Sequence, residues 1–418
     1  MIKNKHILIE LKDDERILYP IKIYETNEIP ISFINLKENN ELKYYKNQLD
    51  EIPNSKDWDL NKKLTNNYEL IHMSNYKRKE NNSISLYNPL SRSYYKMIEI
   101  LHDFNILDNY KHKNIITGHL AEGPGGFIEA IVNKRRNKND KYHAITLKSV
   151  RKEIPGWRKA KFLLEKNTNI HIHYGKDDTG NLYNLENIID YAVKIQNKCD
   201  IVTADGGFDF SINFNLQEQL SSHLIFCEIV TALTVQKIGG VFICKIFDSY
   251  CKITVDLLWL LSCVYDKVII TKPYTSRPAN SEKYIVALGY RGINTTYLNQ
   301  LYQIIIRWNK MDEENKYLHS ILDTFQYNSN FLNIIQLYNI SNSKNQIQNI
   351  KNTLNILKGN INVDKNKIKD KQIKTALSWC KKYNVDVNFN SIYLNNKNRY
   401  IDYYDHYKYN RWIQSLKR

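Results

Sequence analysis

The 418-residue sequence has six cysteines, and no two of them form a CxxC pair. A zinc knuckle and a secreted disulfide framework both need closely spaced cysteines, so the sequence argues against both. Long apolar runs are also absent, because the stretches 224–235 and 255–265 are too short to span a bilayer. The first residues mix apolar and charged side chains, which is not the pattern of a signal peptide. We therefore expect an intracellular protein with reduced thiols and no membrane partner.

Glycine and proline are scarce, with 14 and 8 residues, and they are unevenly placed. All glycines except Gly359 lie between Gly118 and Gly292, and no proline follows Pro278. Because tight turns favour these residues, the turns are concentrated in one central block, as expected where strands alternate with helices. The tail from residue 293 contains only Gly359 of these turn-forming residues and is predicted to be mainly helical.

Acidic residues are in the minority. The 44 Asp and Glu stand against 60 Lys and Arg, which gives a net charge of +16. This sign favours a polyanionic partner, nucleic acid before membrane, although a solvated basic surface gives the same excess. Hydrophobic residues make up 42% of the sequence, which excludes an intrinsically disordered chain. The length predicts two or three domains.

The central block alternates strands with helices. Strands are predicted at 114–121, 142–147, 170–173, 199–204, 241–245, 267–271 and 283–288. Helices are predicted at 127–134, 156–164, 184–195, 216–237 and 254–263. This alternation predicts an α/β fold with a doubly wound, mostly parallel sheet, which binds its ligands at the carboxyl ends of the strands.

The flanking regions show weaker patterns. Residues 7–11 and 17–24 alternate in polarity and predict a two-stranded hairpin. Helices of the tail are predicted at 296–310, 346–357 and 371–383. The tail ends in tyrosines and basic residues at 400–418. Such a stretch suits contact with RNA bases and phosphates, or equally the packing of a helical cap onto the central block.

The sharpest local feature is a glycine-rich turn, Leu120-Ala-Glu-Gly-Pro-Gly-Gly-Phe127, between a predicted strand and a predicted helix. Such a turn lets backbone N–H groups approach a ligand at the start of a helix. It is neither the GxGxxG dinucleotide fingerprint nor a P-loop, because no Gly-Lys-Ser or Gly-Lys-Thr follows. Taken alone, the turn has a purely structural explanation as well.

Four ionisable residues stand where the predicted elements would bring them together. Asp205 comes just past one strand, Lys245 ends the next, and Glu282 precedes the last. Because the carboxyl ends of parallel strands share one edge of a sheet, these three are expected to lie close together. Lys96 lies on the first turns of an upstream helix. Lys245 has apolar neighbours, and a lysine in such surroundings needs partners.

These four residues match the Lys-Asp-Lys-Glu tetrad of the FtsJ/RrmJ-like RNA 2′-O-methyltransferases. Within that family the sequence most resembles the mRNA cap 2′-O-methyltransferases, over the segments 204–208, 240–248 and 272–284. The order of the motifs is also that of the family. The resemblance therefore implies a Rossmann-like fold that uses S-adenosylmethionine (SAM) as methyl donor.

The resemblance covers residues 85–292, which we expect to form the methyltransferase domain. Residues 1–84 would then be an N-terminal extension, and residues 293–418 a mainly helical, Tyr/Lys-rich C-terminal region. Asn, Ile, Lys and Tyr are heavily used. Their codons are AT-rich, which is typical of the genomes of large DNA viruses and of some protists.

The resemblance also implies which residues bind the donor, whose product is S-adenosylhomocysteine. These are Ser91, Ala121, Glu122, Gly123, Pro124, Gly125, Gly126, Phe127, Asn181 and Leu182. The family often has an aspartate where Asn181 stands and an acidic residue where His119 stands, a role that we expect Glu122 to take. No metal is implied, and no cluster of metal ligands is visible.

A second set of residues is implied to contact RNA. These are Arg78, Asn215, Leu216, Gln217 and Asn280. Arg78 lies in a basic run with Lys77 and Lys79, which suits the triphosphate of a cap, but a solvated charge run explains the same pattern.

The expected chemistry follows from charge. A ribose 2′-hydroxyl is a poor nucleophile until it loses its proton. Lys245 is the expected base, because burial and the charge of Lys96 would both lower its pKa. Asp205 and Glu282 would hold the two lysines in place, and because their charge opposes that lowering, the geometry decides the net shift of the pKa. Attack on the sulfonium methyl then needs mainly positioning.

The main hypothesis is a cap 2′-O-methyltransferase that converts cap-0 to cap-1 RNA. Its partners would be capped mRNA and other capping or transcription proteins, in the cytoplasm, a viral factory or virion, or the nucleus. One alternative is an FtsJ-like methyltransferase of rRNA or tRNA. Another is a catalytically silent RNA-binding scaffold, against which the tetrad argues, because four ionisable groups in a semi-buried cleft cost stability.

Overall fold

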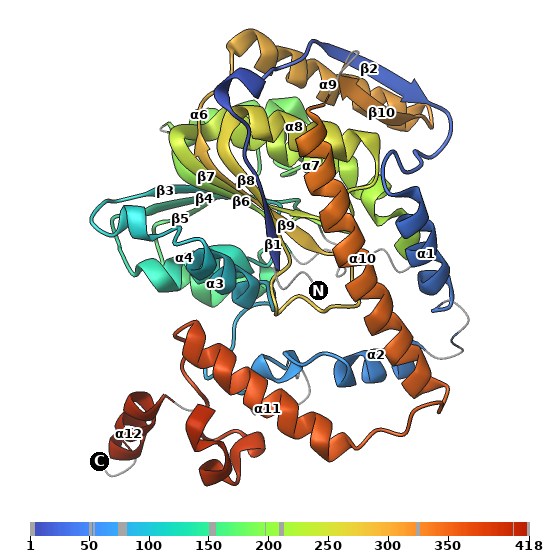
Figure 1. Cartoon of the computed structure of the whole chain (residues 1–418). Helices are drawn as coiled ribbons and strands as arrows, with labels where there is room; N and C mark the ends of the chain where they lie inside the picture. The colour runs from blue at the N-terminus through green and yellow to red at the C-terminus, as the bar shows by residue number, and fades with distance from the viewer. Residues whose placement is uncertain are drawn as a thin grey trace.

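The computed structural model of the chain describes residues 5–49, 52, 55–73, 82–149, 156–196, 198–208, 213–322, 327–403 and 405–415. A central sheet dominates this part of the chain (Figure 1). Its strands are β1 (His6–Ile9), β3 (Ile116–Leu120), β4 (Lys141–Ile145), β5 (Ile170–His173), β6 (Cys199–Ala204), β7 (Gln236–Ile246), β8 (Tyr265–Thr271) and β9 (Lys283–Tyr290). They lie in the order β1-β8-β9-β7-β6-β3-β4-β5.

Six strands of this sheet run in the same direction, which confirms the predicted, mostly parallel topology. Strands β3, β4, β5, β6 and β7 pair in parallel, and β8 runs the same way because both it and β7 pair antiparallel with β9. Only β1 and β9 oppose them among the described strands of the sheet. All carboxyl ends of the parallel strands therefore meet at one edge, where a ligand site is expected.

Helices cover both faces of the sheet. Their bounds are α3 (Ser93–Asp103), α4 (Gly126–Arg135), α5 (Lys161–Lys166), α6 (Leu185–Ile195), α7 (Gln217–Val235) and α8 (Lys252–Val264). Strand β7 shows why two faces form, because its side chains alternate. Phe242 and Cys244 pack into the core under α6, α7 and α8, whereas Val241 and Ile243 pack into the core under α3, α4 and α5. Burial on both faces explains the nearly continuous apolar runs of the central strands.

The remaining elements surround this layered core. They are α1 (Leu36–Asn47), α2 (Ser55–Leu64), α9 (Thr295–Glu313), α10 (Ser329–Leu357), α11 (Lys365–Lys382), α12 (His406–Ser415), β2 (Ile21–Thr26) and β10 (Tyr317–Leu322). Short polar side chains fix where three of the helices begin. Asn294, Asn328 and Asp364 each accept a hydrogen bond from a backbone N–H in the first turn of α9, α10 and α11.

The hairpin predicted near the N-terminus is wrong. Strand β1 instead pairs with β8, with His6 opposite Thr271, and β2 pairs with β10, with Thr26 opposite Tyr317. Alternating polarity indicates a strand but does not choose its partner, and these two strands cover edges that would otherwise be left exposed. Strand β10 also shows that the tail is not wholly helical, although α9, α10, α11 and α12 confirm that it is mainly so.

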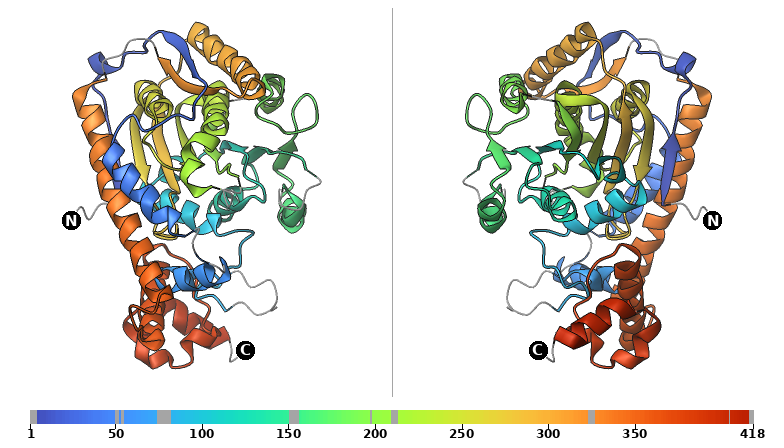
Figure 2. Two further views of the ribbon diagram at one scale, coloured as in Figure 1. Left: turned by 90° about the vertical axis from the view of Figure 1, so that its right-hand side faces the viewer. Right: turned by 90° about the vertical axis from the view of Figure 1, so that its left-hand side faces the viewer.

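Helix α10 ties the flanking regions to the core. Figures 1 and 2 show this long helix running along one side of the molecule, from the layer that contains β2 and β10 to the lower lobe that contains α11. Helices α1 and α2 pack against it. Helix α11 buries Leu377 and Trp379 in the same core as α3 and α4. Among the described residues, no helix is long and apolar enough to cross a membrane.

Candidate active site

Four ionisable side chains from separate elements meet at the carboxyl edge of the sheet. Lys96 of α3 pairs with Glu282, just before β9, with 2.7 Å between Nζ and Oε1. Lys245, near the end of β7, lies 3.3 Å from Oδ1 of Asp205 and also donates to the main-chain oxygen of that residue at 2.8 Å. All four line one pocket of about 650 Å³. The structure thus brings together the four residues that the sequence predicted to act together.

The geometry of the tetrad decides the net direction of the Lys245 pKa shift, which the sequence left open. Burial by itself lowers the pKa of Lys245, but the carboxylates of Asp205 and Glu282 outweigh it, and the net shift of that pKa is upward. The net direction of this shift, which the sequence left to the geometry, is therefore upward in this structure. The charge of Lys96 is offset by its own contact with Glu282. The two lysines in turn hold the pKa of Glu282 at about 2, although burial opposes this.

A fifth ionisable residue lies beneath the tetrad, and the sequence reasoning missed it. Glu228 of α7 is fully buried, and its Oε1 accepts a hydrogen bond from the backbone N–H of Gly206 at 3.1 Å. Burial raises the pKa of this carboxyl to about 8. A lone acidic residue in the apolar stretch 224–235 was the signal that could have revealed it.

The glycine-rich turn has the close packing that a donor site requires. Ala121 and Gly125 have φ of 51° and 104°, in the left-handed region that favours glycine, and α4 begins directly afterwards. A side chain at Gly126 would place its Cβ 2.4 Å from Oγ of Ser91. The left-handed φ of Ala121 strains its backbone, and backbone strain in a residue other than glycine is typical of functional sites. Ser91 and the residues 121–124 line the pocket beside the tetrad.

Other residues of the implied donor site lie deeper. Phe127 is fully buried and packs against Tyr284, and Gly125 lies against Trp157. Glu122 is buried, and its carboxylate lies 3.2 Å from Nδ1 of His119. The residue expected to take the role of the family's acidic side chain therefore contacts the histidine that stands in its place.

The segment that carries Asn181 and Leu182 is held against the end of β4. A Cβ at Gly180 would overlap the carbonyl oxygen of Thr146, which shows how closely the two segments approach. Asn181 accepts a hydrogen bond from the backbone N–H of Tyr183 at 3.0 Å, and Leu182 is buried. The amide NH₂ of Asn181 is the group of that side chain left to contact a ligand. The roles of Asn181 and Leu182 stay predictions.

The residues implied to contact RNA lie along the same pocket or next to it. Gln217 and Asn280 line it, and Asn280 accepts a hydrogen bond from Lys272 at 3.2 Å. Asn215 and Leu216 belong to the short 3-10 helix Phe214–Leu216, whose first residue also lines the pocket. Arg78 lies outside the described residues, as do its basic neighbours.

Two walls of the pocket come from the flanking regions, which the sequence did not predict. Lys46 of α1 donates to Oγ of Ser281 at 2.9 Å and lies 3.3 Å from Oδ2 of Asp248. Gln346 of α10 donates to the same Ser281 oxygen at 3.2 Å. Trp58 of α2 also lines the pocket. No cluster of three or more metal-ligating side chains is present in the described parts of the chain.

Known proteins share this central domain. The model of the FtsJ-like methyltransferase family matches residues 89–290. Residues 89–290 are an FtsJ-like methyltransferase domain. The tetrad and the glycine-rich turn both lie within it. The matched residues lie within the predicted range 85–292, and the family model leaves both flanking regions unmatched.

The similar proteins include cap enzymes. The chain is 33% identical over 200 residues to "Cap-specific mRNA (nucleoside-2'-O-)-methyltransferase 1" of Mus musculus. This match covers 46% of this chain and 23% of that protein. The chain is 34% identical over 241 residues to the protein of the same name from Dictyostelium discoideum, covering 53% of this chain and 31% of that one. The chain thus spans less than a third of the length of these relatives.

Among solved structures, a ribosomal RNA methyltransferase from Plasmodium falciparum is 23% identical, with a TM-score of 0.33. The match covers 49% of this chain and 99% of that one. A TM-score this low supports no conclusion about substrate.

Proposed function

We propose that the protein is a SAM-dependent mRNA cap 2′-O-ribose methyltransferase that converts cap-0 to cap-1 RNA. The observation that carries the proposal is the pairing of Lys96 with Glu282 and of Lys245 with Asp205 beside the glycine-rich turn. The similarity of the surrounding domain to cap-specific enzymes supports the choice of substrate. Capped mRNA is then the partner, and other capping or transcription proteins are further candidates.

The residues present fit the donor. The turn places the N-terminus of the ten-residue helix α4 beside a pocket of about 650 Å³, within the usual range for small-molecule sites. Bound SAM would supply an electrophilic methyl group on a positively charged sulfur. Ser91 and the residues 121–124 would hold the donor from one side, and Asn181 and Leu182 would contact its adenine.

Lys245 is the group that would take the proton of the 2′-hydroxyl, at Nζ. Because Asp205 and Glu282 raise its pKa, Lys245 is protonated at neutral pH in the free protein. A positive ligand charge close to Nζ would oppose that rise, so the base would become available only in the loaded site. Asp205 fixes the Lys245 ammonium from the strand end, and Glu282 fixes Lys96 opposite it. The rest of the catalysis would be positioning.

Methyl transfer from labelled SAM tests the proposal. Two matched RNAs are needed, one with an N7-methylguanosine cap and one with a bare 5′ triphosphate, and the Lys245→Ala variant serves as control. Label on a 2′-oxygen that needs the cap and disappears in the variant is the expected result. Label independent of the cap would instead indicate a structured-RNA methyltransferase. Failure of the chain to bind SAM would favour the silent scaffold.

The division of the chain is part of the proposal. Residues 85–292 would carry donor binding and chemistry. Residues 1–84 and 293–418 would complete the substrate side of the pocket, as the positions of Lys46, Trp58 and Gln346 suggest.

A further inference from the structure

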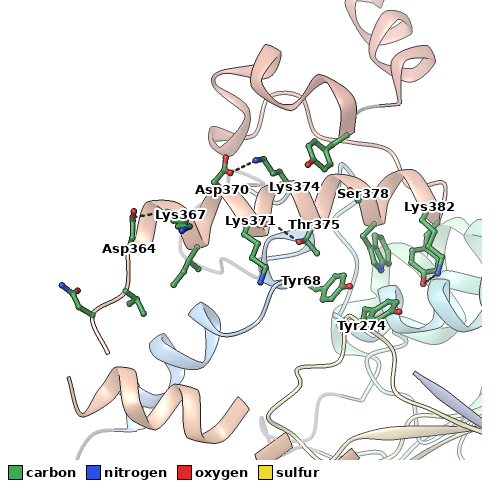
Figure 3. Close-up of a pocket in the computed structure, with 16 residues that line it drawn as sticks. Tyr68, Tyr274, Asp364, Lys367, Asp370, Lys371, Lys374, Thr375, Ser378 and Lys382 are labelled. Carbon is green, nitrogen blue, oxygen red and sulfur yellow. Dashed lines mark hydrogen bonds and ion pairs between the residues drawn. The ribbon is translucent and has the colours of Figure 1, made fainter. Parts of the chain in front are cut away.

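A second, larger groove lies outside the methyltransferase domain's own pocket. Its volume is about 1050 Å³, and one wall is the helix α11. The opposite wall contains Tyr68, which follows α2, and Tyr274, which belongs to the loop before Glu282. Figure 3 shows the two tyrosines lying across the groove from α11. We call this the α11 groove.

The α11 wall is strongly basic. The sequence of α11 holds seven lysines and one acidic residue, Asp370. Lys367, Lys371 and Lys382 are exposed and line the groove. In Figure 3, Lys371 leaves the helix on the side of the two tyrosines. The positive charge of this wall attracts a polyanion.

The acidic residues near the groove are already engaged. Asp370 lies 2.9 Å from Nζ of Lys374 and 3.5 Å from Nη2 of Arg399. Asp364 caps the helix and accepts from the backbone N–H of Asn366 at 2.9 Å. Nζ of Lys382 lies 3.3 Å from Oδ1 of Asp103, so the charge presented to the groove is mainly that of Lys367 and Lys371.

The other wall offers flat aromatic surfaces. The rings of Tyr68 and Tyr274 stack with centroids 5.0 Å apart and an interplanar angle of 19°. Tyr274 is 38% exposed, and Nζ of Lys5 and Nζ of Lys382 lie 4.3 and 5.8 Å from its ring centre. Cations facing stacked aromatic rings form the pattern that binds single-stranded nucleic acid, since bases stack on the rings while lysines meet phosphates. An acidic peptide would use the lysines but has less need for the rings.

A cluster of ion pairs connects the α11 groove with the catalytic pocket. Glu69, next to Tyr68, pairs with Arg277 at 2.9 Å and lies 3.8 Å from Arg92. Both arginines line the catalytic pocket. An RNA chain that leaves the pocket past this cluster would meet the stacked tyrosines beside it.

We propose that the α11 groove binds single-stranded RNA downstream of the nucleotide held in the catalytic pocket. The inference rests on the proposed function for its direction along the RNA, but the binding itself does not depend on methylation. It assigns a role to part of the C-terminal region that the family model leaves unmatched. The groove would add affinity for long transcripts over short ones.

The test compares two pairs of lysines on the same helix. Lys367→Gln/Lys371→Gln removes two groove lysines, and Lys365→Gln/Lys369→Gln removes the same charge from lysines of α11 that do not line the groove. Nζ of Lys369 lies 4.8 Å from the ring centre of Tyr393, and the control substitutions remove this contact. The control variant is therefore not expected to be more stable than the groove variant. Binding of a fluorescent single-stranded RNA is measured across a range of salt concentrations.

The groove pair should weaken binding several-fold. Each phosphate contact with single-stranded RNA contributes about 0.7 to the slope of log K against log salt, so the slope should become shallower by about 1.4. The control pair should keep the slope of the wild type. In the methylation assay, KM for a long capped RNA should rise in the groove pair only, while KM for a capped dinucleotide stays unchanged.

Equal slopes for the groove pair and the control pair would overturn the proposal. So would a groove pair that loses binding of an acidic peptide but not of RNA, since that would indicate a protein partner. If no variant or wild type methylates any RNA while the difference in slope persists, the groove assignment stands and the proposed function fails. Loss of methylation on the dinucleotide as well would show damage to the catalytic pocket, and the groove would then carry no separate role.

Discussion

Replacing Glu228 by glutamine is expected to make the protein more stable, and increasingly so as the pH rises. The carboxyl is fully buried below the tetrad, and burial raises its pKa from 4.5 to about 8. In the unfolded chain the group ionises above pH 4.5, whereas the folded chain keeps it neutral until about pH 8. The folded state therefore loses stability as the pH rises from 4.5 to 8, and the loss levels off above pH 8.

The size of the effect follows from the two pKa values. The loss is about 1 kcal/mol at pH 5 and about 4 kcal/mol at pH 8, at 1.36 kcal/mol per pKa unit. The Glu228→Gln side chain cannot ionise, and its amide oxygen can still accept the hydrogen bond from Gly206. The advantage of the variant in free energy of unfolding should thus grow by about 3 kcal/mol between these pH values.

Urea unfolding followed by tryptophan fluorescence at pH 5, 6.5 and 8 measures this difference. Glu165→Gln is the matched control, because that side chain is 63% exposed and its removal should leave no pH-dependent difference. A Glu228→Gln advantage that stays constant with pH would refute the reasoning about the raised pKa. A variant less stable than the wild type at every pH would show that the carboxylate is needed ionised.

Three further changes test other parts of the site. Gly126→Ala would place a Cβ 2.4 Å from Oγ of Ser91, so SAM affinity measured by calorimetry should fall about tenfold or more. Lys46→Met removes one ion-pair partner of buried Asp248 and should lower the free energy of unfolding by about 1–3 kcal/mol in urea. The tetrad lysines hold the pKa of Glu282 at about 2 despite its burial. The ionised carboxylate therefore stabilises the fold above pH 4.5, and this stabilisation is lost as the pH falls through 2. Glu282→Gln should flatten that acid limb of the unfolding curve.

The sequence predicted the central domain well because its signals there are local. The strand 170–173 alternates isoleucine with histidine, the strand 199–204 is mostly apolar, and the structure has the same bounds. Asp205 and Lys245 could be placed at one edge because parallel strands must end together. The position of each residue relative to its own strand was sufficient for that inference.

The rest could not be read from local patterns. Lys46 and Ser281 are far apart in sequence, and no periodicity in either segment predicts their contact. The partners of β1 and β2 were missed for the same reason, since alternation describes one strand only. The direction of the Lys245 pKa shift depended on the distances to its carboxylates, which no spacing of residues supplies.

The contacts of Ser281 explain why the flanking regions matter for the chemistry. Its hydroxyl accepts hydrogen bonds from Lys46 of α1 and from Gln346 of α10, and it directly precedes Glu282. Helices α1 and α10 pack on each other, so both donors are placed by a single contact outside the methyltransferase domain. The side chain that holds Lys96 is therefore positioned in part by residues that the family model does not cover. The regions on both sides of the matched residues therefore contact the loop that carries Glu282 to the tetrad and Tyr274 to the α11 groove.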